Sequence, residues 1–105
     1  MQDITEFVRA NHQSGISLAT VAEALGYDYY YISKLFHRVF NMPFKEFLNS
    51  YRLETALGLL TETSKSIASI AEESGFQSIR SFNDIFLKRT GVSPAQYRKQ
   101  LAQKN

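Results

Sequence analysis

Hydrophobic residues recur at helical spacing along nearly the whole chain, and one ten-residue pattern occurs twice. Residues 17–26 are SLATVAEALG and residues 66–75 are SIASIAEESG. In both copies a serine suited to a helix N-cap precedes apolar residues three and four positions apart, and a glycine suited to a helix stop follows. Signals for β-strands are nearly absent, because no run of alternating polarity is bounded by turn residues. The pattern predicts an all-α protein that contains a duplicated helix–turn–helix.

The periodicity predicts seven helices, at about residues 3–11, 18–25, 29–40, 44–60, 67–74, 79–90 and 94–102. Asn41-Met42-Pro43 ends the third helix. Ser93 and Pro94 begin the seventh, where a proline at the first helical position loses no hydrogen bond. We expect a first helix–turn–helix subdomain over residues 1–43, a connecting helix over 44–61 and a second subdomain over 62–105.

The predicted fourth helix changes its apolar face between Tyr51 and Leu53. Its early stripe is Phe44, Phe47, Leu48 and Tyr51, and its later stripe is Leu53, Ala56, Leu57 and Leu60. Such a helix is either a rigid connector between two units or a long core helix of one bundle. As a connector it would span roughly 25 Å. That length is compatible with two units that contact DNA about one helical turn, ~34 Å, apart.

The third predicted helix has one apolar face and one polar face. Ile32, Leu35, Phe36, Val39 and Phe40 form an expected core stripe, toward which Tyr29 leans. The opposite face carries Tyr30, Ser33, Lys34 and His37, with Arg38 beside it and Tyr31 toward the flank. Hydroxyl, ammonium, imidazole and guanidinium groups suit phosphates and base edges. Tyr30 is interpreted either as a DNA contact or as a half-buried surface aromatic.

The sixth predicted helix repeats this arrangement with a less favourable outer face. Phe82, Ile85 and Phe86 form the inner stripe, and Arg80, Asn83, Asp84 and Leu87 face outward with Lys88 at one side. Arg80 suits guanine, and Asn83 suits adenine or a phosphate. Asp84 repels phosphates, accepts from a cytosine amino group, or pairs with Arg80 four residues earlier.

Composition and charge narrow the function classes. The chain has 105 residues, no cysteine and a formal net charge of +2. Residues 1–62 carry five basic and seven acidic side chains, a charge of −2, and residues 63–105 carry seven and three, a charge of +4. No signal peptide or membrane-spanning run is visible, so we expect a cytoplasmic protein. No nucleophile elbow, metal-ligand cluster or phosphate-binding glycine loop is present either, so we expect neither an enzyme nor a cofactor. His12 is expected to be solvated.

Over nearly its whole length, the chain resembles the DNA-binding domain of the AraC/XylS family of bacterial transcription regulators. The similarity is strongest over residues 70–98, IAEESGFQSIRSFNDIFLKRTGVSPAQYR, with I-A, G-F, S-x-F, Phe, Gly, Pro and Y-R at the family's offsets. The resemblance implies seven helices in two homeodomain-like subdomains, with the third and sixth helices in successive major grooves. It implies DNA contacts by Tyr30, Tyr31, Ser33, Lys34 and His37, and by Ile79, Arg80, Asn83 and Asp84. Asp84 and Leu87 depart from the family's basic residues, and Asn41 replaces its usual glycine.

The function predicted on this basis is sequence-specific binding of double-stranded DNA by a transcription regulator. The alternative is a protein-interaction module of the same fold that uses Tyr30, Asp84 and Leu87 to contact RNA polymerase or another regulator. The domain alone is expected to be monomeric. The chain is either a fragment of a longer regulator or a short standalone member of the family.

Overall fold

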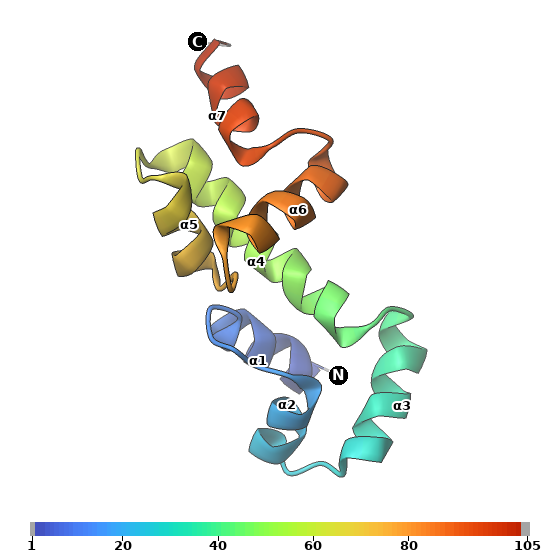
Figure 1. The fold of residues 1–105 in the computed structure, drawn as a ribbon. Coiled ribbons are helices and arrows are strands. Elements are labelled where there is room, and N and C mark those ends of the chain that lie inside the picture. The colour runs from blue at the N-terminus through green and yellow to red at the C-terminus, as the bar shows by residue number, and fades with distance from the viewer. Residues whose placement is uncertain (1, 104–105) are drawn as a thin grey trace. The chain divides into compact units, whose positions relative to one another are not determined.

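In the computed structural model, which describes residues 2–103, the described chain forms seven α-helices and no strand (Figure 1). The helices are α1 Gln2–Asn11, α2 Leu18–Leu25, α3 Tyr29–Phe40, α4 Phe44–Glu62, α5 Ile67–Ser74, α6 Ile79–Thr90 and α7 Pro94–Gln103. The predicted all-α class is confirmed. Four helices, α2, α3, α5 and α6, have the predicted bounds, and α4 continues two residues beyond the predicted Leu60.

Local capping explains why the helix bounds follow the sequence so closely. The hydroxyls of Ser17 and Ser66 accept from the backbone N–H groups of Thr20 and Ser69, at 3.2 and 3.1 Å. These bonds satisfy backbone donors that the first helical turn leaves unpaired. At the end of α3, Asn41 has φ 52° and ψ 39°, in the left-handed region that asparagine tolerates better than most residues. The prediction that Asn41 replaces a helix-ending glycine is therefore confirmed.

The chain divides into two compact units, one up to Tyr51 and one from Arg52 onward. Side chains from α1, α2, α3 and the first half of α4 form the core of the first unit. Its buried members are Ile4, Val8, Val21, Ala22, Ile32, Phe36, Phe47 and Leu48. The ring of Phe47 contacts Phe36 and Phe40, with centroid distances of 5.3 and 4.6 Å. The aromatic contacts fix α3 against the start of α4.

The second unit has its own core, built from the later half of α4 and from α5 and α6. Its buried members are Leu53, Ala56, Leu60, Ile70, Ala71, Phe76, Phe82 and Phe86. The change of apolar face along α4 thus corresponds to two separate cores. The division between the units falls within α4, whereas the predicted boundaries treat residues 44–61 as a separate connecting helix. That three-part division stays a prediction.

Three side chains do not lie where the sequence pattern placed them. His12 is 7% exposed rather than solvated: its Nδ1 donates to the carbonyl oxygens of Val8 and Arg9, and its ring contacts that of Tyr51. Val39 is 50% exposed, because Phe40 rather than Val39 packs against α4 in the last turn of α3. Tyr29 is 45% exposed, and its ring makes an edge contact with its neighbour Tyr30 instead of entering the core.

Candidate nucleic-acid interface

The orientation of α3 is set by two buried side chains and one cap. Ile32 and Phe36 are 0% and 2% exposed, so the face that carries them is turned into the first core. The carboxylate of Asp28 accepts from the backbone N–H of Tyr31 at 3.1 Å and caps the helix. The opposite face of α3 is therefore held toward solvent on a rigid element.

The exposed face of α3 contains most of the residues predicted to contact DNA. Tyr30, Lys34 and His37 lie on one stripe, at positions i, i+4 and i+7 of the helix. Tyr30 is 75% exposed and Tyr31 is 58% exposed, so Tyr30 is not a half-buried aromatic. The remaining predicted contacts on this helix are exposed Lys34, His37 and Arg38 and half-buried Ser33.

The same construction occurs in α6. Phe82 and Phe86 are fully buried, and the hydroxyl of Ser78 accepts from the backbone N–H of Ser81 at 3.0 Å. The predicted contacts Ile79, Arg80, Asp84 and Lys88 are exposed, and Asn83 is half-buried. Two apolar side chains, Ile79 and Leu87, are 46% and 51% exposed. The outer face of α6 therefore combines cationic, amide, carboxylate and aliphatic groups.

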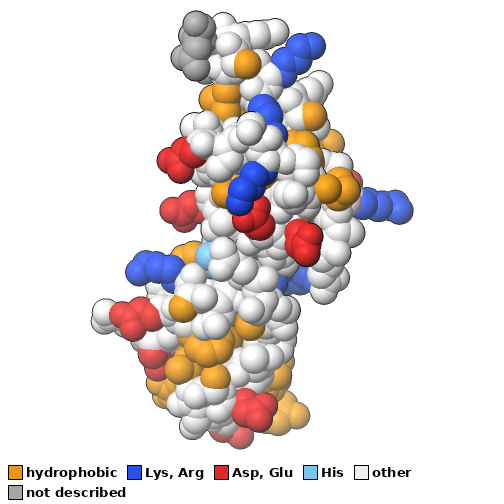
Figure 2. Space-filling model, turned by 90° about the vertical axis from the view of Figure 1, so that its left-hand side faces the viewer, with side chains coloured by type: hydrophobic (Ala, Val, Ile, Leu, Met, Phe, Trp, Pro, Cys, Tyr) orange, Lys and Arg blue, Asp and Glu red, His pale blue; other side chains and the backbone are white. Residues whose placement is uncertain are grey.

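Helices α3 and α6 each carry more basic than acidic side chains, as α7 also does. The sequence of α3 contains two cationic side chains and no carboxylate, and α6 contains three cationic side chains and Asp84. Within the described part of the chain, no ion pair joins Arg80 to Asp84. On the face drawn in Figure 2, acidic and basic side chains are interspersed. An anionic ligand would therefore meet no carboxylate on α3 and one, that of Asp84, on α6.

Two side chains beside α3, Asp3 and Tyr27, are not among the functional residues that the sequence pattern predicts. The Tyr27 hydroxyl donates to the Asp3 carboxylate at 2.6 Å, and the Tyr27 ring stacks with that of Tyr31. One sequence feature could have indicated the role of Tyr27. The two copies of the repeat differ at this position, where the second copy has Phe76. Phe76 is 6% exposed and belongs to the core, whereas Tyr27 is 37% exposed.

Across residues 2–103, no group of three His, Asp or Glu side chains is placed to hold a metal ion. No helix in the same range has the length and apolar character needed to span a membrane. The polar groups on α3 and α6 are hydrogen-bond donors, acceptors and charges on two helices whose other faces are buried. Groups of this kind suit an extended polar surface such as duplex DNA.

Residues 21–100 match the family model described as a helix-turn-helix domain. The chain is 34% identical over 93 residues to the melibiose operon regulatory protein of Escherichia coli, a match that covers 89% of this chain and 31% of that protein. The chain therefore spans about a third of the length of this curated relative.

Two solved structures have the same fold. An AraC-type transcriptional regulator from Chromobacterium violaceum has a TM-score of 0.86 at 26% identity, over 99% of this chain and 93% of that one. The DNA-binding domain of the transcriptional factor AdpA, solved with a target DNA, has a TM-score of 0.91 at 19% identity. That match covers 99% of this chain and 94% of the AdpA chain, and it shows the likeness of fold alone.

Proposed function

This chain belongs to the AraC/XylS family of transcription regulators as a DNA-binding domain, and we propose that α3 and α6 enter successive major grooves of one specific DNA site. The observation that carries the proposal is the matching construction of the two helices. In each, buried aromatic or aliphatic residues fix one face, and donors and cations occupy the exposed face. A rigidly held helix of this kind fits the width of the major groove.

On α3, we propose that Lys34 contacts a base or phosphate at the centre of the interface. Tyr30 and His37, on the same stripe, would contact the neighbouring bases or phosphates. Tyr31, Ser33 and Arg38 would contact the DNA from the flanks of the stripe, Arg38 through phosphate oxygens. Because α3 contains no carboxylate, nothing on the helix itself opposes its approach to the phosphates.

On α6, we propose that Arg80 donates to the edge of a guanine and Asn83 to an adenine or a phosphate. Exposed Ile79 would pack against a thymine methyl group, and Lys88 would contact a phosphate. Asp84 lies one helical turn from Arg80 without pairing to it in the described structure. Its carboxylate would then either weaken binding by repulsion or accept from a cytosine.

Selection of bound sequences from random duplex DNA, followed by a salt titration on the selected site, tests this proposal. We expect two short conserved blocks about one helical turn apart and an affinity that falls steeply with added salt through counterion release. Selection of a single block would restrict base recognition to one unit. Failure to enrich any sequence would overturn the proposal.

We expect Lys34→Ala to weaken binding to the selected site by about 1–3 kcal/mol if Lys34 contacts a base. The unfolding transition should not change, since the Lys34 side chain is exposed and outside the first core. Fluorescence anisotropy on the selected site and a thermal melt measure the two quantities. Lys45→Ala, an exposed lysine at the start of α4, is the matched control. Wild-type affinity in Lys34→Ala would remove Lys34 from the interface.

Asp84→Asn should raise general DNA affinity if the carboxylate acts only by repulsion, because the change removes a negative charge and keeps the side-chain shape. If Asp84 accepts from a cytosine, discrimination should instead fall by about 1–3 kcal/mol at one position. A base-by-base competition assay on the selected site separates the two. If neither affinity nor base preference changes, Asp84 does not face the DNA.

The exposed apolar surface of Leu87 favours a second candidate, in which α6 contacts RNA polymerase or another regulator. An apolar protein contact would respond weakly to salt, in contrast to DNA binding. The domain alone would be a monomer under this proposal, and sedimentation measures that state directly. Leu87→Ala should weaken such a protein contact and leave the salt slope of DNA binding unchanged.

A further inference from the structure

A hydrogen bond connects the first turn of α1 with the turn that precedes α3. The Tyr27 hydroxyl donates to Oδ2 of Asp3 at 2.6 Å, across 24 positions of sequence. The other carboxylate oxygen, Oδ1, accepts from the backbone N–H of Ile4 at 2.9 Å. Asp3 is therefore held by its own helix while it holds Tyr27.

The ring of Tyr27 continues this connection to α3. It stacks with the ring of Tyr31 at a centroid distance of 6.3 Å and an interplanar angle of 27°. The backbone of Tyr31 is fixed separately, through its N–H bond to Asp28. Although Tyr31 is 58% exposed, its ring is thus in contact with a ring that is itself anchored.

The hydrogen bond between Tyr27 and Asp3 is charge-assisted, and such bonds are stronger than those between neutral groups. Its 2.6 Å length falls in the range for a hydroxyl that donates to an ionised carboxylate. The hydrogen bond lowers the pKa of Asp3 and raises the pKa of Tyr27, each from its ordinary value. At neutral pH the carboxylate is therefore ionised and the hydroxyl keeps its proton, which are the states that the bond requires.

We propose that Asp3 and Tyr27 are positioning residues for DNA recognition, which hold the Tyr31 ring in one orientation on the exposed face of α3. This inference rests on the proposed function, in which Tyr31 contacts DNA. Neither positioning residue needs to touch DNA, and a carboxylate at Asp3 would repel phosphates if it did. The gain is preorganisation, because an exposed ring that is ordered before binding loses less rotamer freedom on binding.

The arrangement belongs to the first unit alone. The second copy of the repeat has Phe76 in place of Tyr27, and Phe76 is buried and has no hydroxyl. Position 81, which corresponds in α6 to Tyr31 in α3, is a serine. The two units thus present different recognition surfaces on similar scaffolds, with a supported aromatic surface only on α3.

Tyr27→Phe and Asp3→Asn test the proposal, because each removes the charge-assisted bond and retains most of the side-chain shape. Each should weaken binding to the selected site by about two- to tenfold, the range expected for one hydrogen bond. The double variant should bind the selected site as tightly as the single variant that binds it less tightly, because both changes remove the same hydrogen bond. In a Tyr31→Ala background, neither change should have any further effect.

Glu6→Gln is the matched control, since Glu6 is an exposed carboxylate on the same helix that accepts from the side-chain amide of Gln2 rather than from a tyrosine. It should leave site affinity unchanged. In the free chain, NMR of the tyrosine rings should show the Tyr31 signals shift in Tyr27→Phe and Asp3→Asn but not in Glu6→Gln. A purely structural role for the bond would change the melting temperature without changing the Tyr31 signals.

The failure of this inference can be distinguished from the failure of the proposed function. Wild-type selection of a site, together with unchanged affinity in both Tyr27→Phe and Asp3→Asn, would overturn the positioning role and leave DNA recognition by α3 intact. Unchanged affinity in Tyr31→Ala would remove Tyr31 from the interface and overturn the inference with it. Failure of the wild-type chain to select any site would overturn the proposed function itself.

Discussion

Phe86→Ala should lower the free energy of unfolding by about 3–5 kcal/mol, the usual cost of removing a buried phenylalanine ring. Phe86 is fully buried in the second core. Its ring makes edge contacts with Phe82 and Tyr97, each at a centroid distance of 5.6 Å. Loss of the ring would leave a cavity between α6 and α7 that rigid neighbours cannot close. Urea unfolding followed by circular dichroism measures the change.

Leu87→Ala is the matched control for Phe86→Ala, since it truncates the adjacent side chain on the exposed side of the same helix. Leu87 is 51% exposed, so its truncation should change stability by no more than about 0.5 kcal/mol. Equal effects at the two positions would mean that the inner face of α6 is wrongly assigned. Loss of DNA binding in Phe86→Ala would reflect unfolding of the second unit rather than a lost contact.

The helices could be predicted because their ends depend on nearby residues. A serine hydroxyl that caps a helix bonds a backbone N–H only three residues away, as Ser17 and Ser66 do. The inner stripe of α6 could be predicted for a similar reason, because burial of Phe82 and Phe86 follows from helical spacing alone. Once the inner stripe is known, the exposed face is its complement.

The features that the sequence did not reveal depend on contacts between distant residues or at helix ends. Tyr27 and Asp3 are 24 positions apart, and no local pattern pairs them. His12 has an ordinary surface context in the sequence, yet its ring lies 6.1 Å from that of Tyr51 on α4 and is buried. Val39 has the correct helical phase for the core, but in the last turn of α3 the next residue, Phe40, packs against α4 in its place. Helical periodicity predicts the side of a helix on which a residue lies, but it does not predict where along that side a neighbouring helix is in contact.

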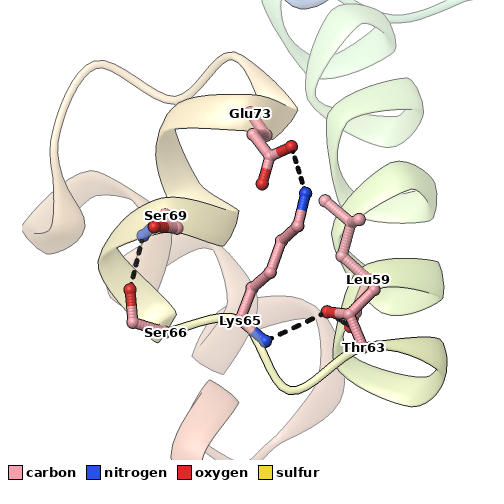
Figure 3. A network of polar contacts seen from close by, with 6 residues as sticks. All are labelled: Leu59, Thr63, Lys65, Ser66, Ser69 and Glu73. Atoms are coloured by element: carbon pink, nitrogen blue, oxygen red, sulfur yellow. Dashed lines mark hydrogen bonds and ion pairs between the residues drawn. The ribbon is translucent and has the colours of Figure 1, made fainter.

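The connection between α4 and α5 shows how a short segment is held without hydrophobic burial. The hydroxyl of Thr63 donates to the carbonyl of Leu59 at 2.6 Å and accepts from the backbone N–H of Lys65 at 3.2 Å (Figure 3). The ammonium of Lys65 pairs with Glu73 of α5 at 2.6 Å, but both side chains are nearly half exposed. Exposed pairs of this kind contribute little to stability. The stronger restraint on the connection comes from α7.

Arg98 supplies that restraint, and its loss is expected to have the second large effect on stability. Its guanidinium donates to the carbonyl oxygens of Leu60, Thr63 and Lys65. The last turn of α4 has no basic residue of its own, so Arg98 also provides the positive charge that stabilises the carboxyl end of that helix. One planar group thus joins α7 to the end of α4 and to the connection before α5.

Arg98→Met should lower the free energy of unfolding by about 2–4 kcal/mol, because it removes three bonds from a charged donor and leaves three carbonyls without that partner. Arg98→Lys should recover only part of this loss, since an ammonium cannot reach three separated acceptors as a planar guanidinium does. Urea unfolding measures the stability, and faster amide hydrogen exchange at residues 63–66 would locate the effect in the connection. Lys99→Met removes the same charge from an exposed neighbouring position, so it should change stability by less than about 0.5 kcal/mol. If the Arg98→Met variant had the same free energy of unfolding as the Lys99→Met variant, the three hydrogen bonds would not hold the connection. In that case α7 would contribute to the second unit only through its apolar face.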